Sequence, residues 1–207
     1  MRKMVSATIA CVAFSFFGAY AQSTPQTEDV IKAQFLFPGL SYEKSIGPRF
    51  TVYTGGWVGF NTEVTEDFGS SDIDIKFYAE PGATVNLRYY YNFENREARG
   101  KRTELNNLNY LAPVYQFAYS RTSLKPDKYD NETSARPVHL FGIVWGFQRN
   151  YPRRFSLDLN LGVGYATANT TVYEWVNNNQ VETKSMVGGL TLINQFTLGI
   201  WLNARNN

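Results

Sequence analysis

Apolar and polar residues alternate strictly over several long stretches of the chain. In residues 155–166, large apolar side chains occupy every odd position, and small or polar ones occupy every even position. Side chains of a β-strand point to opposite faces with this period of two, so the pattern predicts a long strand. Similar alternation covers 83–93, 190–202 (interrupted at Asn194), and more loosely 49–61, 106–121 and 137–149. The chain is therefore predicted to be all-β and antiparallel.

Strand length and the nature of the polar face indicate the class of β-protein. The predicted strands run for eleven residues or more, whereas soluble sandwiches use strands of about 5–6 residues. The polar face is rich in Gly, Asn, Thr, Gln and Tyr and poor in Lys and Glu, which suits a crowded interior. Apolar-out, polar-in alternation is typical of a transmembrane up-and-down β-barrel. A secreted sandwich is the alternative. In a barrel, Leu87 and Leu159 face lipid and Asn160 faces inward.

The predicted connections alternate between short and long. Links at 46–48, 94–105 and 150–153 are the shorter ones, and the polar stretches 62–71, 122–136 and 168–185 are the longer ones. In outer-membrane barrels, short turns are periplasmic and long loops are extracellular. This scheme contains seven long strands, so an even number requires one more crossing near the start.

Residues 31–44 are the candidate for the extra crossing. Their apolar face switches parity at Pro38-Gly39, which predicts a two-residue hairpin that pairs Phe37 with Leu40 and Phe35 with Tyr42. The barrel would then have eight strands. One bulged strand over the same segment is the alternative.

The first 21 residues are predicted to be a cleaved signal peptide. Arg2 and Lys3 precede an apolar stretch at 4–18, and Ala19-Tyr20-Ala21 forms a small-x-small cleavage site. The predicted organisation is a signal peptide at 1–21 and one barrel domain at 22–207. Cys11 is the only cysteine of the chain, so the mature domain forms no disulfide.

Composition excludes several other classes. The 207 residues are 43% hydrophobic, 16% aromatic and 18% charged, which excludes a disordered chain or a coiled coil. Signal cleavage removes two of the 20 basic residues and none of the 18 acidic ones. The mature domain is then balanced at 18 of each sign, and this balance favours no nucleic-acid partner.

Four segments carry a resemblance to a known group of proteins. They are LSYEKSIGPRF (40–50), LRYYYNF (87–93), NLNYLAPVYQFAYS (107–120) and IVWGFQRNYPRRFSLDLNLGVGY (143–165). With them, the chain resembles the small outer-membrane β-barrel proteins of Bacteroidota-type bacteria. The resemblance implies an eight-stranded barrel in the outer membrane, in contact with its lipid and lipopolysaccharide. It implies no catalytic residues.

Candidate catalytic and metal-binding residues are few. His139 is the only histidine and lies on the outer-face parity of its strand. Barrel lipid A deacylases carry a serine two residues after such a histidine, but here that residue is Phe141. No enzymatic activity, cofactor or metal site is therefore predicted. The acidic residues Glu63, Glu66, Asp67, Asp72 and Asp74 fit a solvated loop better than a calcium site, and the sequons at Asn131 and Asn169 are uninformative.

The inward face is predicted to fill the barrel. It carries the bulky residues Tyr53, Trp57, Tyr90, Tyr110 and Trp201 and a cluster of three charges, Glu43, Arg88 and Asp158. A buried carboxylate needs a partner, and the long Arg88 side chain could reach one or both. These features predict a structural or surface-interaction role for a side-chain-filled barrel. Two alternatives remain: a small pore or transporter with the cluster as a constriction, and a lipid-modifying enzyme.

Overall fold

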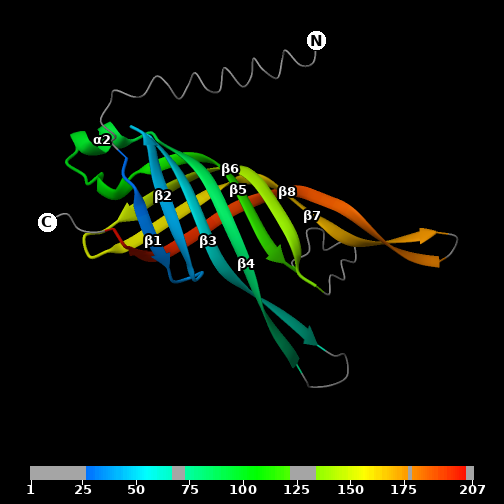
Figure 1. Ribbon diagram of the computed structural model, residues 1–207. Coiled ribbons are helices and arrows are strands. Elements are labelled where there is room, and N and C mark those ends of the chain that lie inside the picture. The colour runs from blue at the N-terminus through cyan, green and yellow to red at the C-terminus, as the bar shows by residue number, and fades with distance from the viewer. Residues whose placement is uncertain (1–26, 67–72, 122–133, 177–178, 204–207) are drawn as a thin grey trace, which may run out of the picture.

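The eight-stranded prediction is confirmed. A computed structural model describes residues 27–66, 73–121, 134–176 and 179–203, which form one closed barrel of eight antiparallel strands in chain order (Figure 1). The strands are β1 (Val30–Gln34), β2 (Gly39–Gly47), β3 (Phe50–Glu66), β4 (Ile73–Tyr90), β5 (Asn109–Ser120), β6 (Arg136–Asn150), β7 (Phe155–Val176) and β8 (Asn179–Trp201). The β4–β5 connection contains the helix α2 (Phe93–Ala98) and the 3-10 turn η2 (Glu104–Asn106). No helix in these ranges has the length and apolar character needed to cross a membrane.

The N-terminal hairpin exists, but the prediction of a two-residue turn at Pro38-Gly39 is wrong. The turn contains four residues, 35–38, and Leu40 pairs with Ala33 instead of Phe37. Gly39 is the first residue of β2, where a Cβ atom would lie 2.2 Å from the carbonyl oxygen of Gly56. The observed register moves the partner of Leu40 by four residues, an even number, so every side chain keeps its predicted face.

The predicted facing of the strands is confirmed. On β7, Asp158 and Asn160 are buried, whereas Leu161 and Val163 are exposed. On β4, Arg88 is buried and its neighbour Leu87 is exposed. Polar residues therefore fill the inside of this barrel and apolar residues cover its outside.

Strong strand tilt brings residues from distant strands to one level of the interior. Going once around the barrel from Lys32, from each residue to its partner on the next strand, ends at Gly189 on β8. Lys32 itself pairs with Trp201 on β8, so the two positions on β8 are staggered by twelve residues. Such a stagger tilts the strands against the barrel axis and sets the width of the interior.

The two ends of the barrel differ in build. One end carries α2, η2 and the described residues nearest both termini (Figure 1). At the other end the β3–β4 and β7–β8 hairpins extend far beyond the rest of the wall, whereas β1 and β2 turn back early at 35–38. The wall is therefore low at the β1–β2 hairpin.

Candidate functional site: a polar cluster inside the barrel

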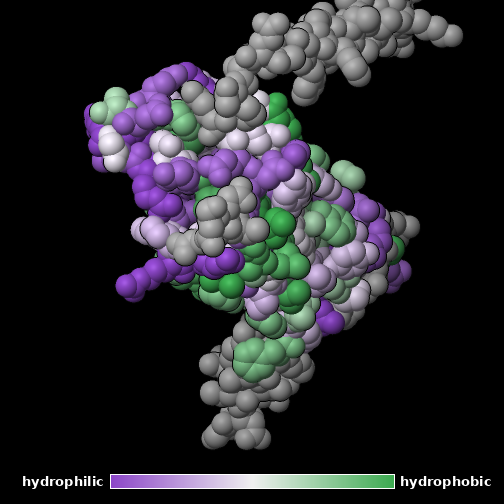
Figure 2. All heavy atoms as spheres, turned by 60° about the vertical axis from the view of Figure 1, so that its left-hand side comes forward, coloured by the Kyte–Doolittle hydropathy of each residue, from purple (hydrophilic) through white to green (hydrophobic). Residues whose placement is uncertain are grey.

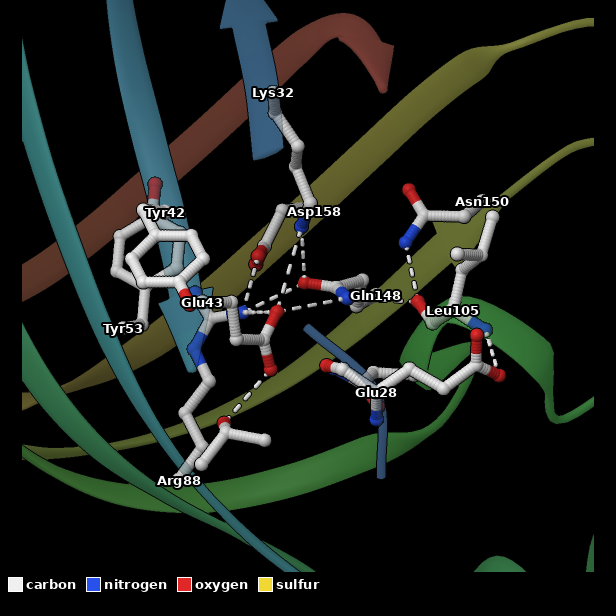
Figure 3. Close-up of polar contacts among 12 residues, drawn as sticks. Glu28, Lys32, Tyr42, Glu43, Tyr53, Arg88, Leu105, Gln148, Asn150 and Asp158 are labelled. Atoms are coloured by element: carbon white, nitrogen blue, oxygen red, sulfur yellow. Dashed lines mark hydrogen bonds and ion pairs between the residues drawn. The ribbon is translucent and has the colours of Figure 1, made fainter. Parts of the chain in front are cut away.

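The structure brings Glu43, Arg88 and Asp158 together at one level of the interior (Figure 3). They come from β2, β4 and β7, and the alternation of each strand points them inward. The two residues that complete this interior polar cluster are Lys32 on β1 and Gln148 on β6, and all five side chains are less than 9% exposed.

Arg88 is the centre of the cluster. Its Nη1 lies 2.8 Å from Asp158 Oδ2 and 3.7 Å from Glu43 Oε2, so it reaches both carboxylates. The same nitrogen donates a hydrogen bond of 2.7 Å to Gln148 Oε1. The guanidinium is also stacked between two rings, 4.0 Å from the centroid of Tyr53 and 4.2 Å from that of Tyr110, a contact that favours a buried cation.

Lys32 is the charged residue that the sequence reasoning missed. Its Nζ donates a hydrogen bond to Gln148 Oε1 and lies 3.7 Å from Glu43 Oε2. Gln148 Nε2 in turn donates to Glu43 Oε2 at 3.1 Å. The cluster thus contains two cations and two anions. The alternation of Ile31 and Ala33 on the apolar face already placed Lys32 inward, so this signal was present in the sequence.

Hydroxyl groups complete the environment of the carboxylates. Glu43 Oε1 accepts hydrogen bonds from Thr51 Oγ1, at 2.7 Å, and from the hydroxyl of Tyr90. Asp158 Oδ1 accepts one from the Tyr110 hydroxyl, also at 2.7 Å. Carboxylates held by both cations and hydroxyls are compensated charges, which suits a structural element better than a vacant ligand site.

Four of the five bulky residues expected in the interior are buried: Tyr53, Tyr90, Tyr110 and Trp201. Tyr90 and Tyr110 belong to an apolar core that also includes Phe93 and Leu108 from the β4–β5 connection. The fifth, Trp57, is only half-buried. Its ring lies against the wall, where a Cβ on Gly82 would be 2.4 Å from it and one on Gly59 would be 3.0 Å from it.

The β4–β5 connection closes the end of the barrel next to the cluster. The Glu28 amide donates to Asn106 Oδ1 at 2.7 Å, and Asn106 Nδ2 donates to the Glu28 carbonyl at 2.7 Å. The carbonyl of Leu105 accepts bonds from Asn150 Nδ2, at 2.6 Å, and from Gln148 Nε2, at 3.3 Å. This cap was not predicted, because it depends on positive φ angles at Leu105 and Asn106.

Asp29 ties the segment before β1 to the outside of β2. Its carboxylate accepts hydrogen bonds from Lys44 Nζ at 2.6 Å, from the Ser45 amide at 2.8 Å and from the Tyr42 hydroxyl at 2.9 Å. Partial burial alone would raise the pKa of Asp29, but these hydrogen bonds together hold its pKa below the usual value. The chain entering β1 is therefore fixed by Asp29 on the outside and by Glu28 at the cap.

His139 lies among aromatic rings on β6. Its Nδ1 is hydrogen-bonded to the Tyr115 hydroxyl at 2.9 Å, and its ring stacks on that of Tyr115. Phe117 packs against the same imidazole. This environment suits an aromatic band on the outer surface, and within the described residues the hydrogen bond of the imidazole is to a tyrosine hydroxyl.

Most of the other candidate side chains from the sequence, those of the acidic residues and the sequons, lie outside the part of the chain that the structure describes. Asp67, Asp72 and Asn131 lie outside the described residues, and so do the side chains of Glu63, Glu66 and Asp74. Within the described ranges, no three His, Cys, Asp or Glu side chains gather as a metal site requires.

Comparison with known proteins identifies a family without a known activity. Residues 7–195 match the model of DUF3575, a protein family of unknown function. No curated protein and no solved structure matches the chain. The function must therefore be argued from the barrel itself.

Proposed function

Because the chain belongs to the DUF3575 family, whose function is not known, we propose a function for it from its own geometry. The protein is an integral β-barrel of the bacterial outer membrane, exported by a signal peptide at 1–21. It has a structural or surface-interaction role and no enzymatic activity. Outer-membrane lipid and lipopolysaccharide are its surroundings.

The observation that carries this proposal is the apolar band around the outside of the barrel. Exposed large hydrophobic side chains occur on all eight strands, and many are more than half exposed. They include Leu40 (63%), Phe60 (64%), Phe77 (75%), Ile143 (63%), Val163 (62%), Leu190 (89%) and Leu192 (77%). Figure 2 shows one side of the band: hydrophobic residues gather across the middle of the barrel and hydrophilic ones at the end that carries α2.

Such a surface is costly in water. Removing one Leu, Ile or Phe side chain from water is worth about 1.5–3 kcal/mol, and soluble monomers rarely expose apolar patches larger than a few hundred Å². A band around the whole barrel is stable when hydrocarbon surrounds it. Apolar residues outside and polar residues inside match the arrangement of outer-membrane barrels.

Aromatic residues with polar tips occur toward both edges of the band. Near the capped end, Trp145 Nε1 donates a hydrogen bond of 2.7 Å to the Tyr91 hydroxyl. Toward the other end, Tyr165 is exposed and Tyr115 packs on His139 and Phe141. Girdles of aromatic residues mark the two lipid–water boundaries of such barrels. The long β3–β4 and β7–β8 hairpins extend from the uncapped end, as the extracellular loops of such barrels do, so we assign the capped end to the periplasm.

The interior favours a closed barrel over the pore alternative. The interior polar cluster and the rings of Tyr53, Tyr90 and Tyr110 fill the level next to the cap, and the cap itself blocks that end. An ion-selective constriction would need cluster groups open to water, whereas Arg88 and Glu43 are at most 1% exposed.

Cell fractionation tests the proposal. We expect the processed protein, beginning at Gln22, in the outer-membrane fraction after modest expression in a Gram-negative host. Recovery of the folded protein in the soluble periplasmic fraction would contradict it. Planar-bilayer recording tests the closed interior: the wild-type protein and Arg88→Ala should both stay silent, and reproducible porin-sized conductance steps from the wild type would favour the pore.

A further inference from the structure

The low wall at the β1–β2 hairpin leaves a gap between β3 and β8. Pairing of β1 with β8 ends at Gln34 and Gly199, and pairing of β2 with β3 ends at Gly39 and Trp57. The last backbone bonds on the two sides join Phe35 N to the Leu198 carbonyl and Val58 N to the Pro38 carbonyl. Beyond them, within the described residues, β3 and β8 have no strand partner on the sides that face each other.

Backbone polar groups line this gap. In antiparallel strands, alternate residues direct both N–H and C=O to the same neighbour. On β8 the residues bonded to β1 have even numbers, so the next even ones, Phe196, Asn194 and Leu192, direct theirs into the gap. Pro38 has no N–H and therefore cannot donate a hydrogen bond to the carbonyl of Val58.

The gap lies at the level of the apolar band. Leu192 and Asn194 on β8 pair with Val163 and Leu161 on β7, respectively. Both β7 residues are exposed and belong to the apolar band on the outside of the barrel. If the proposed function is right, the gap therefore faces hydrocarbon. Unpaired backbone groups at membrane depth are tolerated only where they are covered by protein or line a cavity.

A cavity of about 360 Å³ occupies the gap. Trp57, Gln116 and Gln195, at inward positions of their strands, line it on the inner side, and Leu36, Phe37, Asn194 and Phe196 line it on the outer side. Asn194 is the residue that interrupts the apolar face of its strand in the sequence. The cavity is therefore polar toward the barrel interior and largely apolar toward the outside.

The polar lining consists of uncharged groups. Among the described residues no charged side chain lines the cavity, and the Gln116 amide offers both donors and an acceptor. Gln195 Oε1 already accepts a hydrogen bond of 3.2 Å from Asn160 Nδ2, so Gln195 offers its amide N–H groups to a ligand. The buried indole N–H of Trp57 has no hydrogen-bond partner within the described part of the chain. Since buried polar groups are normally hydrogen-bonded, this N–H is a candidate donor to a ligand.

We propose that the gap is a lateral portal that binds a single-chain amphiphile with an uncharged polar head, of the monoacylglycerol type, taken from the outer leaflet. The head lies in the cavity, hydrogen-bonded to Gln116, Gln195 and the Trp57 N–H. The acyl chain passes between Phe37 and Phe196 into the bilayer. The cavity volume is at the lower end of the range for ligand sites, about 300–1,000 Å³, which suits one small head group.

Tryptophan quenching tests this proposal, which rests on the proposed membrane location. A chain with Trp145→Phe and Trp175→Phe is placed in phosphatidylcholine vesicles and titrated with monoacylglycerol brominated near its ester. The same chain with Trp57→Phe gives the background of Trp201, so the difference reports Trp57. We expect saturable quenching of Trp57 that excess unbrominated monoacylglycerol reverses.

Two variants on β8 test the role of the cavity. Gln195→Leu removes a head-group contact, and we expect about tenfold weaker half-saturation, the value of one hydrogen bond of about 1.4 kcal/mol. Thr197→Val, on the same inward face but outside the cavity lining, should leave half-saturation unchanged. Equal effects of the two substitutions would overturn the assignment of the head group to this cavity.

The failure of the portal and the failure of the membrane proposal give different results. Trp145, alone retained in a third chain, lies on the outer face and should be quenched without saturation. If Trp57 behaves in the same unsaturable way, the portal is wrong and the membrane location stands. If Trp145 is not quenched at all, the membrane location itself is wrong. A dimer that covers the gap would show a doubled mass and no Trp57 quenching, which also overturns the portal.

Discussion

Replacing Arg88 by methionine tests whether the interior polar cluster stabilises the barrel. The substitution keeps a long side chain but removes the ion pair of 2.8 Å with Asp158 and the longer one with Glu43. Lys32 is then the one cation left in the cluster beside two buried carboxylates. Breaking a buried ion pair from one side costs about 3–5 kcal/mol, so we expect a loss of unfolding free energy in that range.

The assay is urea unfolding of the barrel in lipid vesicles, followed by tryptophan fluorescence. Adding Asp158→Asn to Arg88→Met removes one uncompensated charge and keeps a side chain that accepts the Tyr110 hydroxyl. The double variant should therefore recover about 1 kcal/mol or more, a typical coupling for residues in contact. Arg99→Met, at an exposed position beyond α2, is the control and should change stability by at most about 0.5 kcal/mol.

Two results would refute the reasoning. One is an Arg88→Met barrel that unfolds within about 0.5 kcal/mol of the unsubstituted one, the range of an ordinary surface change. The other is strict additivity of the two substitutions, which would mean that Arg88 and Asp158 do not interact. Either result would leave the cluster without a structural role.

Two further predictions concern the outer face and the wall. Leu159→Arg places a charge in lipid and should lower barrel stability in vesicles by about 2–4 kcal/mol. Asn160→Arg faces inward and should impair refolding through crowding, to an extent that does not change with bilayer thickness. Equal dependence on bilayer thickness for both variants would contradict the facing. Gly82→Ala should displace the ring of Trp57, 2.4 Å from the added Cβ, and shift its fluorescence. Gly56→Ala is the control, because it lies on the opposite face of the strand from Trp57 and its added Cβ would lie 3.9 Å from the nearest atom outside its two chain neighbours. Matching spectra of the two variants would disprove the packing.

Alternation along the strands was sufficient to predict much of this barrel. A period of two fixes the face of every residue once one face is known, so the inward direction of Glu43, Arg88 and Asp158 followed from the sequence. The same rule placed Lys32 inward, but a lysine next to a turn was not recognised as a cluster member. The turn itself was misplaced because registers that differ by an even number of residues give the same facing.

Features that depend on long-range contacts could not be predicted in this way. The cap requires Asn106 to meet Glu28, 78 residues earlier in the chain, and no local pattern predicts that contact. The position of the Trp57 ring depends on Gly59 in its own strand and on Gly82 in the neighbouring one. The early turn of β1 and β2, which opens the wall, becomes visible only when the lengths of β3 and β8 are known.

Gel mobility with and without boiling tests the central claim, that this chain is a membrane-embedded β-barrel. The protein without residues 1–21 is refolded into phosphatidylcholine vesicles, washed with urea and run in mild detergent. An intact barrel should stay with the vesicles and migrate at a different position until it is boiled. Identical mobility before and after boiling, together with release into the urea wash, would contradict the account.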